Sequence, residues 1–588
     1  MINKSFLFYC LLVLLIIPKS AGATIYINNQ TDFNNISKLV KETIDKGELS
    51  IKVVILPGTY EFFEDHITFR DIQAPNVSLK IQGKGQVNII PLGKNYKNGD
   101  IYEGQFNIEN SWMNGRQDVN IWGNAKFIDG LVEVVNEENK LCRFKSEDSF
   151  PKDIDVSNAY VLTPQWYTSK AYKINRIEEE YVYFTAFDLN ISYSGGWNVN
   201  DDYNYSQKKL RYRLCNVGLD EDGLMLINKK ITLPSMCPSI HEGKVQSFIT
   251  IDNCSFKSIE INNLFFLGNG ARNKKTLIYI SQLNSKKTIV KNCSFIGMRS
   301  GVIYINKSNN IFVDGNVFKD CYYYGIISDN NSINTHVLNN YFYLMGKRVQ
   351  NSFCVSCSGE NFLVKNNEFK DFGYGGVAVG VWYGNEQKNP CRGIVENNEF
   401  SYSETYLKCI IDFGLMDGGA IYSYTKNDCT IIRNNFIHDI SGIADNRGIF
   451  CDDGASGLNI YGNVIIGIQN SYCIDARRVV SVENKPKKMK VERVNMNNVI
   501  ANNIIDGDVR FEANEDVNNG CRYGGNYILT AKKTKMPVIT IKEVDNRDRD
   551  TYLDYIGFHK GKVEVTKESY KVVKRSPIWK GVKKHISK

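Results

Sequence analysis

A short asparagine phrase recurs through the second half of the 588-residue chain. In each copy, two Asn, or Gly followed by Asn, stand just before a strand-like segment with an apolar residue two positions on. The copies lie at 315–318, 339–342, 366–369, 397–400, 434–437, 462–465 and 502–505, with a variant at 292–295. From Asn316 the steps are 24, 27, 31, 37, 28 and 40 residues. This repeat predicts a parallel solenoid, in which the longer steps contain loops.

Between these phrases runs a second apolar pattern, with a period of two residues. Its copies begin at residues 301 (GVIYIN), 325 (GIISDN), 354 (CVSCSG), 376 (GVAVGV), 419 (GAIYSY), 448 (GIFCDD) and 473 (CIDARR). We expect the second and fourth residues of each copy, such as Ile449 and Cys451, to face the core. The third and fifth, such as Phe450 and Asp452, should face outward. Asn residues stacked at one turn position should form side-chain ladders between coils.

The segments outside the repeat predict the domain organisation. Residues 32–46 have helical apolar spacing, and a strand at 52–56 follows, ending in the letters PGTY. The helix could cap the open end of the solenoid. We therefore expect the cap and first coils at 24–90, an inserted β-rich region at 91–250, the repeats at 251–530 and a basic β segment at 531–588.

The first 23 residues have the features of a cleavable signal peptide. Lys4 precedes an apolar run at 6–17, and Ala21-Gly22-Ala23 is a small-x-small cleavage site. The prediction is a secreted or periplasmic protein. No further apolar run is long enough for a membrane span.

Charge and cysteine content narrow the function classes. The net charge is +8, with much of the basic excess at 560–588, and no nucleic-acid-binding motif is present. We therefore expect no nucleic-acid partner. Cys429, Cys451 and Cys473 are 22 residues apart. That spacing predicts buried thiols in neighbouring coils rather than a zinc site, because the paired CxxC motifs are absent.

The Asn repeat and the PGTY segment resemble the pectate-lyase-like superfamily of right-handed parallel β-helices. Within the repeat, DGGAIY at 417–422 and GIFCDDG at 448–454 are similar to phrases in β-helix glycoside hydrolases. The resemblance implies an all-β solenoid that is active on a polysaccharide or oligosaccharide, and we expect a monomer. It further implies a glycoside hydrolase that uses paired Asp residues and needs no cofactor.

The resemblance points to Asp417, Asp452 and Asp453 as catalytic residues. Glycoside hydrolysis needs one protonated and one ionised carboxyl group, and adjacent carboxylates raise each other's pKa. In the expected register, however, Asp417 and Asp452 would be about 20 Å apart along the strands. Either the chain bends before Gly419, or two clusters exist. One would contain Asp417, Asp445 and Arg447, and the other would contain Asp452, Asp453, Ser423, Asp475, Arg477 and Arg478.

Four residues are candidates for substrate binding: Asp475, Arg477, Arg447 and His438. Asp452 and Arg477 are expected in one outward column, which Asp329 and Ser423 should share. Acidic residues followed by Arg resemble the polygalacturonases, although their Gly-His-Gly phrase is missing. A surface ion-pair ladder would explain the same pattern. His438 follows an Asn turn, where it could act as a base or be structural.

Two other functions stay open. A polysaccharide lyase would need a basic residue and often Ca²⁺ held by carboxylates. A glycan-binding or adhesive solenoid would need no convergent carboxylate pair, since fold does not imply function. The positions of Asp417, Asp452 and Asp453 would separate these alternatives.

Overall fold

The structure of the protein is a computed structural model. The described residues are 22–62, 67–91, 102–104, 126–130, 132–136, 138–139, 141–145, 159–164, 169–179, 181–185, 210–216, 231–233, 247–269, 276–298, 301–319, 321, 324–346, 353–380, 391–403, 418–423, 426–440, 447–452, 455–468, 471–476, 479–484, 489–493, 497–511, 522–524 and 526–528. The predicted signal peptide at 1–23, apart from its last two residues, and the basic segment at 531–588 lie outside them.

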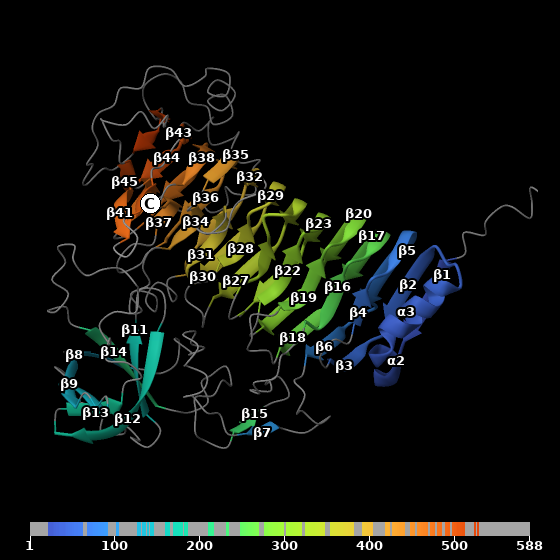
Figure 1. Ribbon diagram of the computed structural model, residues 1–588, viewed down its shortest axis with the longest axis horizontal. Coiled ribbons are helices and arrows are strands. Elements are labelled where there is room, and N and C mark those ends of the chain that lie inside the picture. The colour runs from blue at the N-terminus through green and yellow to red at the C-terminus, as the bar shows by residue number, and fades with distance from the viewer. Residues whose placement is uncertain are drawn as a thin grey trace, which may run out of the picture.

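Three long parallel sheets form a β-helix, and the chain passes through them in the order A, B, C in each coil (Figure 1). Sheet A consists of β1 (Gly22–Ile27), β2 (Ser50–Ile55), β5 (Gln73–Gly83), β17 (Ser255–Asn262), β20 (Asn284–Lys291), β23 (Asn309–Asp314), β26 (Ile333–Leu338), β29 (Glu360–Lys365), β32 (Arg392–Glu396), β35 (Lys426–Arg433), β38 (Ser456–Tyr461), β43 (Val499–Ala501) and β46 (Arg522–Gly524). Sheet B consists of β3 (Gly58–Phe62), β6 (Val87–Pro91), β18 (Phe265–Asn269), β21 (Ser294–Met298), β24 (Val317–Lys319), β27 (Tyr341–Met345), β30 (Glu368–Phe372), β33 (Glu399–Ser401), β36 (Phe436–His438), β39 (Val464–Ile466), β44 (Ile504–Asp506) and β47 (Tyr527–Ile528). Sheet C consists of β4 (Ile67–Arg70), β16 (Ile249–Asp252), β19 (Thr276–Ser281), β22 (Gly301–Asn306), β25 (Ile326–Ser328), β28 (Phe353–Cys357), β31 (Gly375–Val379), β34 (Gly419–Ser423), β37 (Arg447–Cys451), β40 (Tyr472–Ala476) and β45 (Asp508–Phe511).

Successive coils pair in parallel throughout these sheets, for example β23 with β26, β24 with β27 and β34 with β37. Each crossover between parallel strands returns with the right-handed sense that twisted strands favour. The predicted fold class, a right-handed parallel β-helix, is therefore confirmed.

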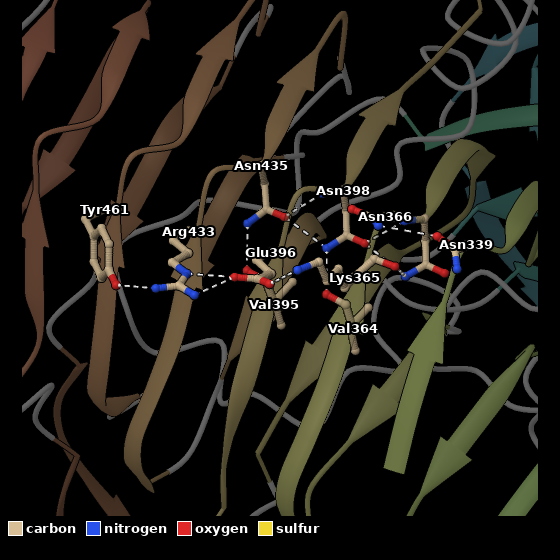
Figure 2. A network of polar contacts seen from close by, with 11 residues as sticks. Asn339, Val364, Lys365, Asn366, Val395, Glu396, Asn398, Arg433, Asn435 and Tyr461 are labelled. Carbon is tan, nitrogen blue, oxygen red and sulfur yellow. Dashed lines mark hydrogen bonds and ion pairs between the residues drawn. The ribbon is translucent and has the colours of Figure 1, made fainter. Parts of the chain in front are cut away.

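The asparagine phrase forms the turn between sheets A and B. Asn398 donates through Nδ2 to Oδ1 of Asn435 at 3.0 Å and to the carbonyl of Val364 at 2.9 Å (Figure 2). Its own Oδ1 accepts from Asn367 in the preceding coil. The same bonds link a continuous ladder of Asn316, Asn340, Asn367, Asn398, Asn435, Asn463, Asn503 and Asn526. Each buried amide is thus satisfied by its copies and by the backbone.

The residue before each ladder Asn explains why the phrase begins with Asn or Gly. Asn339, Asn366 and Asn397 have φ values of 54°, 56° and 55°, and Gly315 has 65°. This left-handed conformation is easily adopted only by Gly and, among other residues, by Asn and Asp. The turn geometry therefore selects both letters of the repeated phrase.

The apolar residue of the phrase faces the interior. Phe266, Phe295, Phe318, Phe342, Phe369 and Phe400 stack from coil to coil, with ring centroids 4.6–5.1 Å apart. All six are fully buried in the main core. Aromatic stacking of this kind adds to area burial and fixes the rise of one coil on the next.

Two short helices lie at the first coil, where Figure 1 shows them at the blue end of the solenoid. They are α2 (Gln30–Asn34) and α3 (Ile36–Asp45), which together span the predicted helix. Phe33, Ile36 and Val40 are fully buried in the main core. The helices therefore cover the apolar end of the solenoid that strands alone would leave open.

The solenoid is interrupted in sequence between β6 and β16, yet β4 pairs directly with β16 and β5 with β17. The strands between them are antiparallel: β8 (Lys126–Gly130), β14 (Leu210–Asn216), β11 (Ala159–Pro164), β12 (Ser169–Glu178), β13 (Tyr181–Thr185), β10 (Leu141–Lys145) and β9 (Val132–Asn136) form one sheet, and β7 (Tyr102–Gly104) pairs with β15 (Ile231–Leu233). A later hairpin pairs β41 (Val479–Asn484) with β42 (Met489–Arg493).

The cysteine prediction is only partly right. Cys451 and Cys473 are buried, but Cys429 is exposed, with a φ of 59° at an irregular point of β35. The coil offset is 25 residues, from Ile449 to Ile474, so Cys451 pairs with Ala476 rather than with Cys473. The equal spacing of the three cysteines is therefore not the coil period. In the part of the chain that the structure describes, no helix is long and apolar enough to cross a membrane.

Candidate functional site

Four of the seven predicted site residues lie within the described ranges: Asp452, Asp475, Arg447 and His438. Asp417, Asp453 and Arg477 lie outside them, as do Asp445 and Arg478. The choice between a bend before Gly419 and two separate clusters therefore stays a prediction. The described residues nevertheless define a polar and aromatic cluster over sheet C.

The register of sheet C differs from the predicted one in two copies. Gly419 pairs with Arg447, not with Gly448, so Ser423 lies beside Cys451 and is buried. The copy at Gly301 is shifted in the same way, because Ile303 pairs with Ile326. The prediction that Ser423 shares the outward column of Asp452 is therefore wrong. Strands β34 and β37 are buried at every position, so alternation could not set their register.

The corrected register defines an outward column along sheet C. Tyr422 pairs with Phe450, Phe450 with Asp475 and Asp475 with Arg510. Asp452 lies two residues beyond Phe450, at the end of β37. Its backbone N–H donates to the carbonyl of Ser423 at 2.7 Å, which anchors it to the preceding coil.

The Asp452 carboxylate accepts a hydrogen bond from a tyrosine. The hydroxyl of Tyr422 donates to Oδ2 of Asp452 at 2.7 Å, across two neighbouring coils. Tyr422 is only 3% exposed, whereas Asp452 is half-buried. Burial, followed by the proximity of Tyr374 and Asp452, raises the pKa of Tyr422 well above its usual value. The phenol therefore stays protonated and remains a donor to the carboxylate.

Aromatic rings surround this hydrogen bond. The Tyr422 ring lies 5.7 Å from that of Tyr374, 5.4 Å from that of Phe353 and 5.2 Å from that of Phe450, measured between centroids. Such surroundings exclude water from the Tyr422 ring, which donates to the Asp452 carboxylate. A charge there interacts more strongly with its neighbours than it would in bulk solvent.

Asp475 and Arg447, both predicted to bind substrate, form a buried ion cluster in the next coils. Both are 0% exposed, and Nε of Arg447 donates to Oδ2 of Asp475. Arg510 donates to the same carboxylate through Nε at 2.7 Å and Nη2 at 2.5 Å. The Arg447 guanidinium also lies 3.8 Å from the centroid of the Phe450 ring. The cluster thus ties Phe450, and the strand that carries Asp452, to the following coils.

His438 lies on the outer face of sheet B, not on sheet C. Its Nδ1 lies 2.9 Å from Oδ2 of Asp439, and its Nε2 lies 3.1 Å from Oε1 of Glu399. Its ring stacks on Phe436 at 4.2 Å. Burial acts to lower the pKa of His438, but its bonds to Asp439 and Glu399 outweigh burial and raise it. These contacts hold the imidazole between two carboxylates.

Sequence reasoning missed Tyr422, Tyr374 and Arg510. Tyr422 stands within the phrase 417–422. The predicted register differs by one residue from the observed one and assigned Tyr422 to a core-facing position. Arg510 belongs to the short strand β45, which no phrase of the repeat marks. Across the described ranges, no group of three His, Cys, Asp or Glu side chains is arranged to hold a metal ion.

Comparisons with known proteins give only distant structural matches. No protein-family model matches the chain, and no curated protein sequence matches it. Among solved structures, a glycoside hydrolase is 11% identical with a TM-score of 0.44, covering 86% of this chain and 97% of its own. The A-module of the Azotobacter vinelandii mannuronan C-5 epimerase AlgE4 is 11% identical with a TM-score of 0.35, covering 86% and 95%. An alginate lyase from Paenibacillus sp. str. FPU-7 is 8% identical with a TM-score of 0.28, covering 77% and 98%. Similarities at this level assign neither a substrate nor a reaction to this chain.

Proposed function

We propose that this chain is a carbohydrate-active β-helix protein that hydrolyses glycosidic bonds at the outer face of sheet C. Asp452 is the central residue of the proposal, acting as the ionised base or nucleophile. The observation that carries it is the hydrogen bond from the buried Tyr422 hydroxyl to Asp452. Export through the N-terminal signal peptide is part of the same proposal.

The direction of this hydrogen bond supports an ionised Asp452. A phenol that donates to a carboxylate stabilises its ionised form and fixes one of its two oxygens. An ionised and oriented carboxylate is what either glycosidase mechanism requires of its base or nucleophile.

The second carboxyl group would come from Asp417 or Asp453. The similarity of their phrases to β-helix glycoside hydrolases supports this assignment, and it is independent of the Tyr422 contact. Asp475 is unsuited to the role, because two guanidinium groups bind both of its oxygens. A proton donor must also reach the substrate, and the Asp475 side chain is 0% exposed.

The substitution Asp452→Asn tests the proposal. The amide cannot transfer a proton or act as an ionised nucleophile, so we expect hydrolysis to fall about 10²- to 10⁴-fold. The thermal transition should change little, because the isosteric side chain is only half-buried. The matched control is Asp314→Asn on the outer face of sheet A, where the carboxylate accepts from Asn339 at 2.8 Å.

The assay is the release of reducing ends from a panel of neutral and acidic polysaccharides. Wild-type activity in Asp452→Asn on a cleaved substrate would exclude the Asp452 assignment. Products with an unsaturated, ultraviolet-absorbing end would indicate the lyase reaction instead. Binding without cleavage by the wild-type protein would indicate a glycan-binding solenoid.

A further inference from the structure

The positional relation between Tyr422 and Asp452 in the candidate site recurs elsewhere on sheet C. In the site, Tyr422 contacts a polar residue that lies in the next coil, two residues beyond the tyrosine's paired position. Tyr279 pairs with Tyr304, and Asn306 occupies the equivalent place in the next coil. Tyr304 pairs with Ile327, and Asp329 follows in the same way. One geometric relation therefore occurs three times on one outer face.

Tyr279 and Tyr304 form a stacked aromatic pair with polar groups beside it. The rings of Tyr279 and Tyr304 stack with centroids 5.9 Å apart and planes 20° apart, and both side chains are half-buried. Asn306 donates through Nδ2 to the Tyr279 hydroxyl at 3.4 Å and to Oγ of Ser281 at 3.1 Å. Hydroxyl, amide and ring surface thus meet within a small area.

The polar groups beside Tyr279 and Tyr304 suit binding rather than catalysis. The Asp329 carboxylate caps a turn, because its Oδ1 accepts from the backbone N–H groups of Lys307 and Asn331 at 3.1 and 3.2 Å and from Oγ of Ser332 at 2.7 Å. Beside Tyr279, Asn306 stands where the candidate site has Asp452, and an amide cannot transfer a proton. Neither Asp329 nor Asn306 therefore repeats the proposed catalytic function of Asp452.

The position of the pair suits a long substrate. The outward column passes from Tyr304 through Ile327, Ser356 and Ala378 to Tyr422, which is four strand steps. At about 4.8 Å per strand, Tyr304 lies about 19 Å and Tyr279 about 24 Å from Tyr422 along the solenoid. Ile327 and Ser356, the next two residues of the column, are smaller than tyrosine and half-buried, so a chain molecule on the two tyrosines could continue along the column toward the Asp452 site.

We propose that Tyr279, Tyr304 and Asn306 form a non-catalytic subsite that binds a distant part of the same polysaccharide chain. The proposal rests on the proposed function of the Asp452 site. A sugar residue presents both apolar C–H surface and hydroxyl groups. An aromatic surface with nearby hydroxyl and amide groups matches both features, and convergent polar groups beside aromatic rings are typical of ligand sites.

The test measures polysaccharide binding in the Asp452→Asn background, which prevents turnover during the measurement. Tyr304→Ala in this background should weaken binding of the polymer about five- to tenfold, since one aromatic contact is lost. Asn306→Ala should weaken it about threefold through the loss of one hydrogen bond. The matched control is Phe312→Ala, which removes a half-buried aromatic side chain from the outer face of sheet A.

Circular dichroism establishes whether each variant is folded. If Tyr304→Ala is unfolded, polymer binding by Asn306→Ala tests the subsite. Polymer binding equal to that of the Asp452→Asn parent, in folded Tyr304→Ala or in Asn306→Ala, would overturn the subsite. Equal weakening by Phe312→Ala would overturn it as well. If wild-type protein neither cleaves nor binds any polysaccharide, both proposals fail. If the parent binds and wild type cleaves but the subsite variants bind normally, only the subsite fails.

Discussion

Sheets A and C pass through the same coils, yet their outer faces are built differently. On sheet A, Glu396 bridges Lys365 in the preceding coil and Arg433 in the next, and Arg433 reaches the Tyr461 hydroxyl (Figure 2). Each of these groups is satisfied by a neighbour in its own column. On sheet C, the column changes from Tyr422 to Phe450, Asp475 and Arg510.

The connections that flank the two sheets differ in the same way. Sheet A leads into sheet B through the two-residue Asn turn, as at residues 315–316 between β23 and β24. Sheet B leads into sheet C through segments of very different length, from Lys319 to Ile326 in one coil and from Ser401 to Gly419 in another. Regular turns hold the coils together, whereas variable connections and a changing column allow unlike residues to meet. The repeat is therefore the scaffold, and departures from it mark the candidate site.

The largest effect should come from breaking the ladder. Asn398 is fully buried and exchanges hydrogen bonds with Asn367, Asn435 and Val364. Asn398→Ala leaves several of these groups unsatisfied, so the free energy of unfolding should fall by about 2–4 kcal/mol in urea denaturation. The control Asn284→Ala, at an exposed position of β20, should change it by less than about 0.5 kcal/mol. Equal effects of the two substitutions would contradict a stabilising ladder.

A smaller effect, on activity instead of stability, should follow Tyr422→Phe. The substitution keeps the ring contacts but removes the donor to Asp452, so hydrolysis should fall about 10- to 100-fold. The acid limb of the pH–rate profile should move to higher pH, because the ionised carboxylate loses a stabilising hydrogen bond. Tyr461→Phe removes a hydroxyl from the sheet A network and should leave activity unchanged. An unshifted pH profile in Tyr422→Phe would show that Tyr422 does not tune Asp452.

The ion pairs of sheet A should stabilise the fold at neutral pH and lose this effect in acid. Burial acts to raise the pKa of Glu396, but Lys365 and Arg433 outweigh it and lower the pKa below its usual 4.5. Its contribution is therefore present above pH 4.5 and is lost as the pH falls through the folded value. Glu396→Gln should cost about 1–2 kcal/mol at neutral pH and less in acid. A pH-independent difference between wild type and Glu396→Gln in unfolding experiments would argue against this reading.

The smallest effect should appear at His438, with the opposite pH dependence. Its folded pKa is raised above 6.5 by Asp439 and Glu399, despite the opposing effect of burial. Its contribution is thus complete below pH 6.5 and is lost as the pH rises through the folded value. Glu399→Gln should lower the free energy of unfolding by about 0.5–1 kcal/mol at pH 6 and by less at pH 9. The charges nearby are Glu368 and Lys370, and a difference that grows with pH would refute the assignment.

The regular part of this molecule was predictable because its interactions are between like residues. An asparagine amide both donates and accepts, so a column of identical side chains satisfies itself, and the repeated letters can be counted along the chain. The same holds for the stacked phenylalanines and for the left-handed residue before each ladder Asn. The capping helix was readable from its apolar spacing, although Asn35 divides it in two.

The sequence by itself therefore determined the β-helix, its Asn turns and its core, because each depends on a local pattern that repeats. Only the tertiary structure decided how the coils align in sheet C, since β31, β34 and β37 are buried at every position and show no alternation to read. That alignment brought Tyr422 to Asp452, buried Asp475 between two arginines and placed His438 on another sheet. Contacts between unlike residues some 30 positions apart have no signature in the local pattern, because only the register of neighbouring coils brings such residues together.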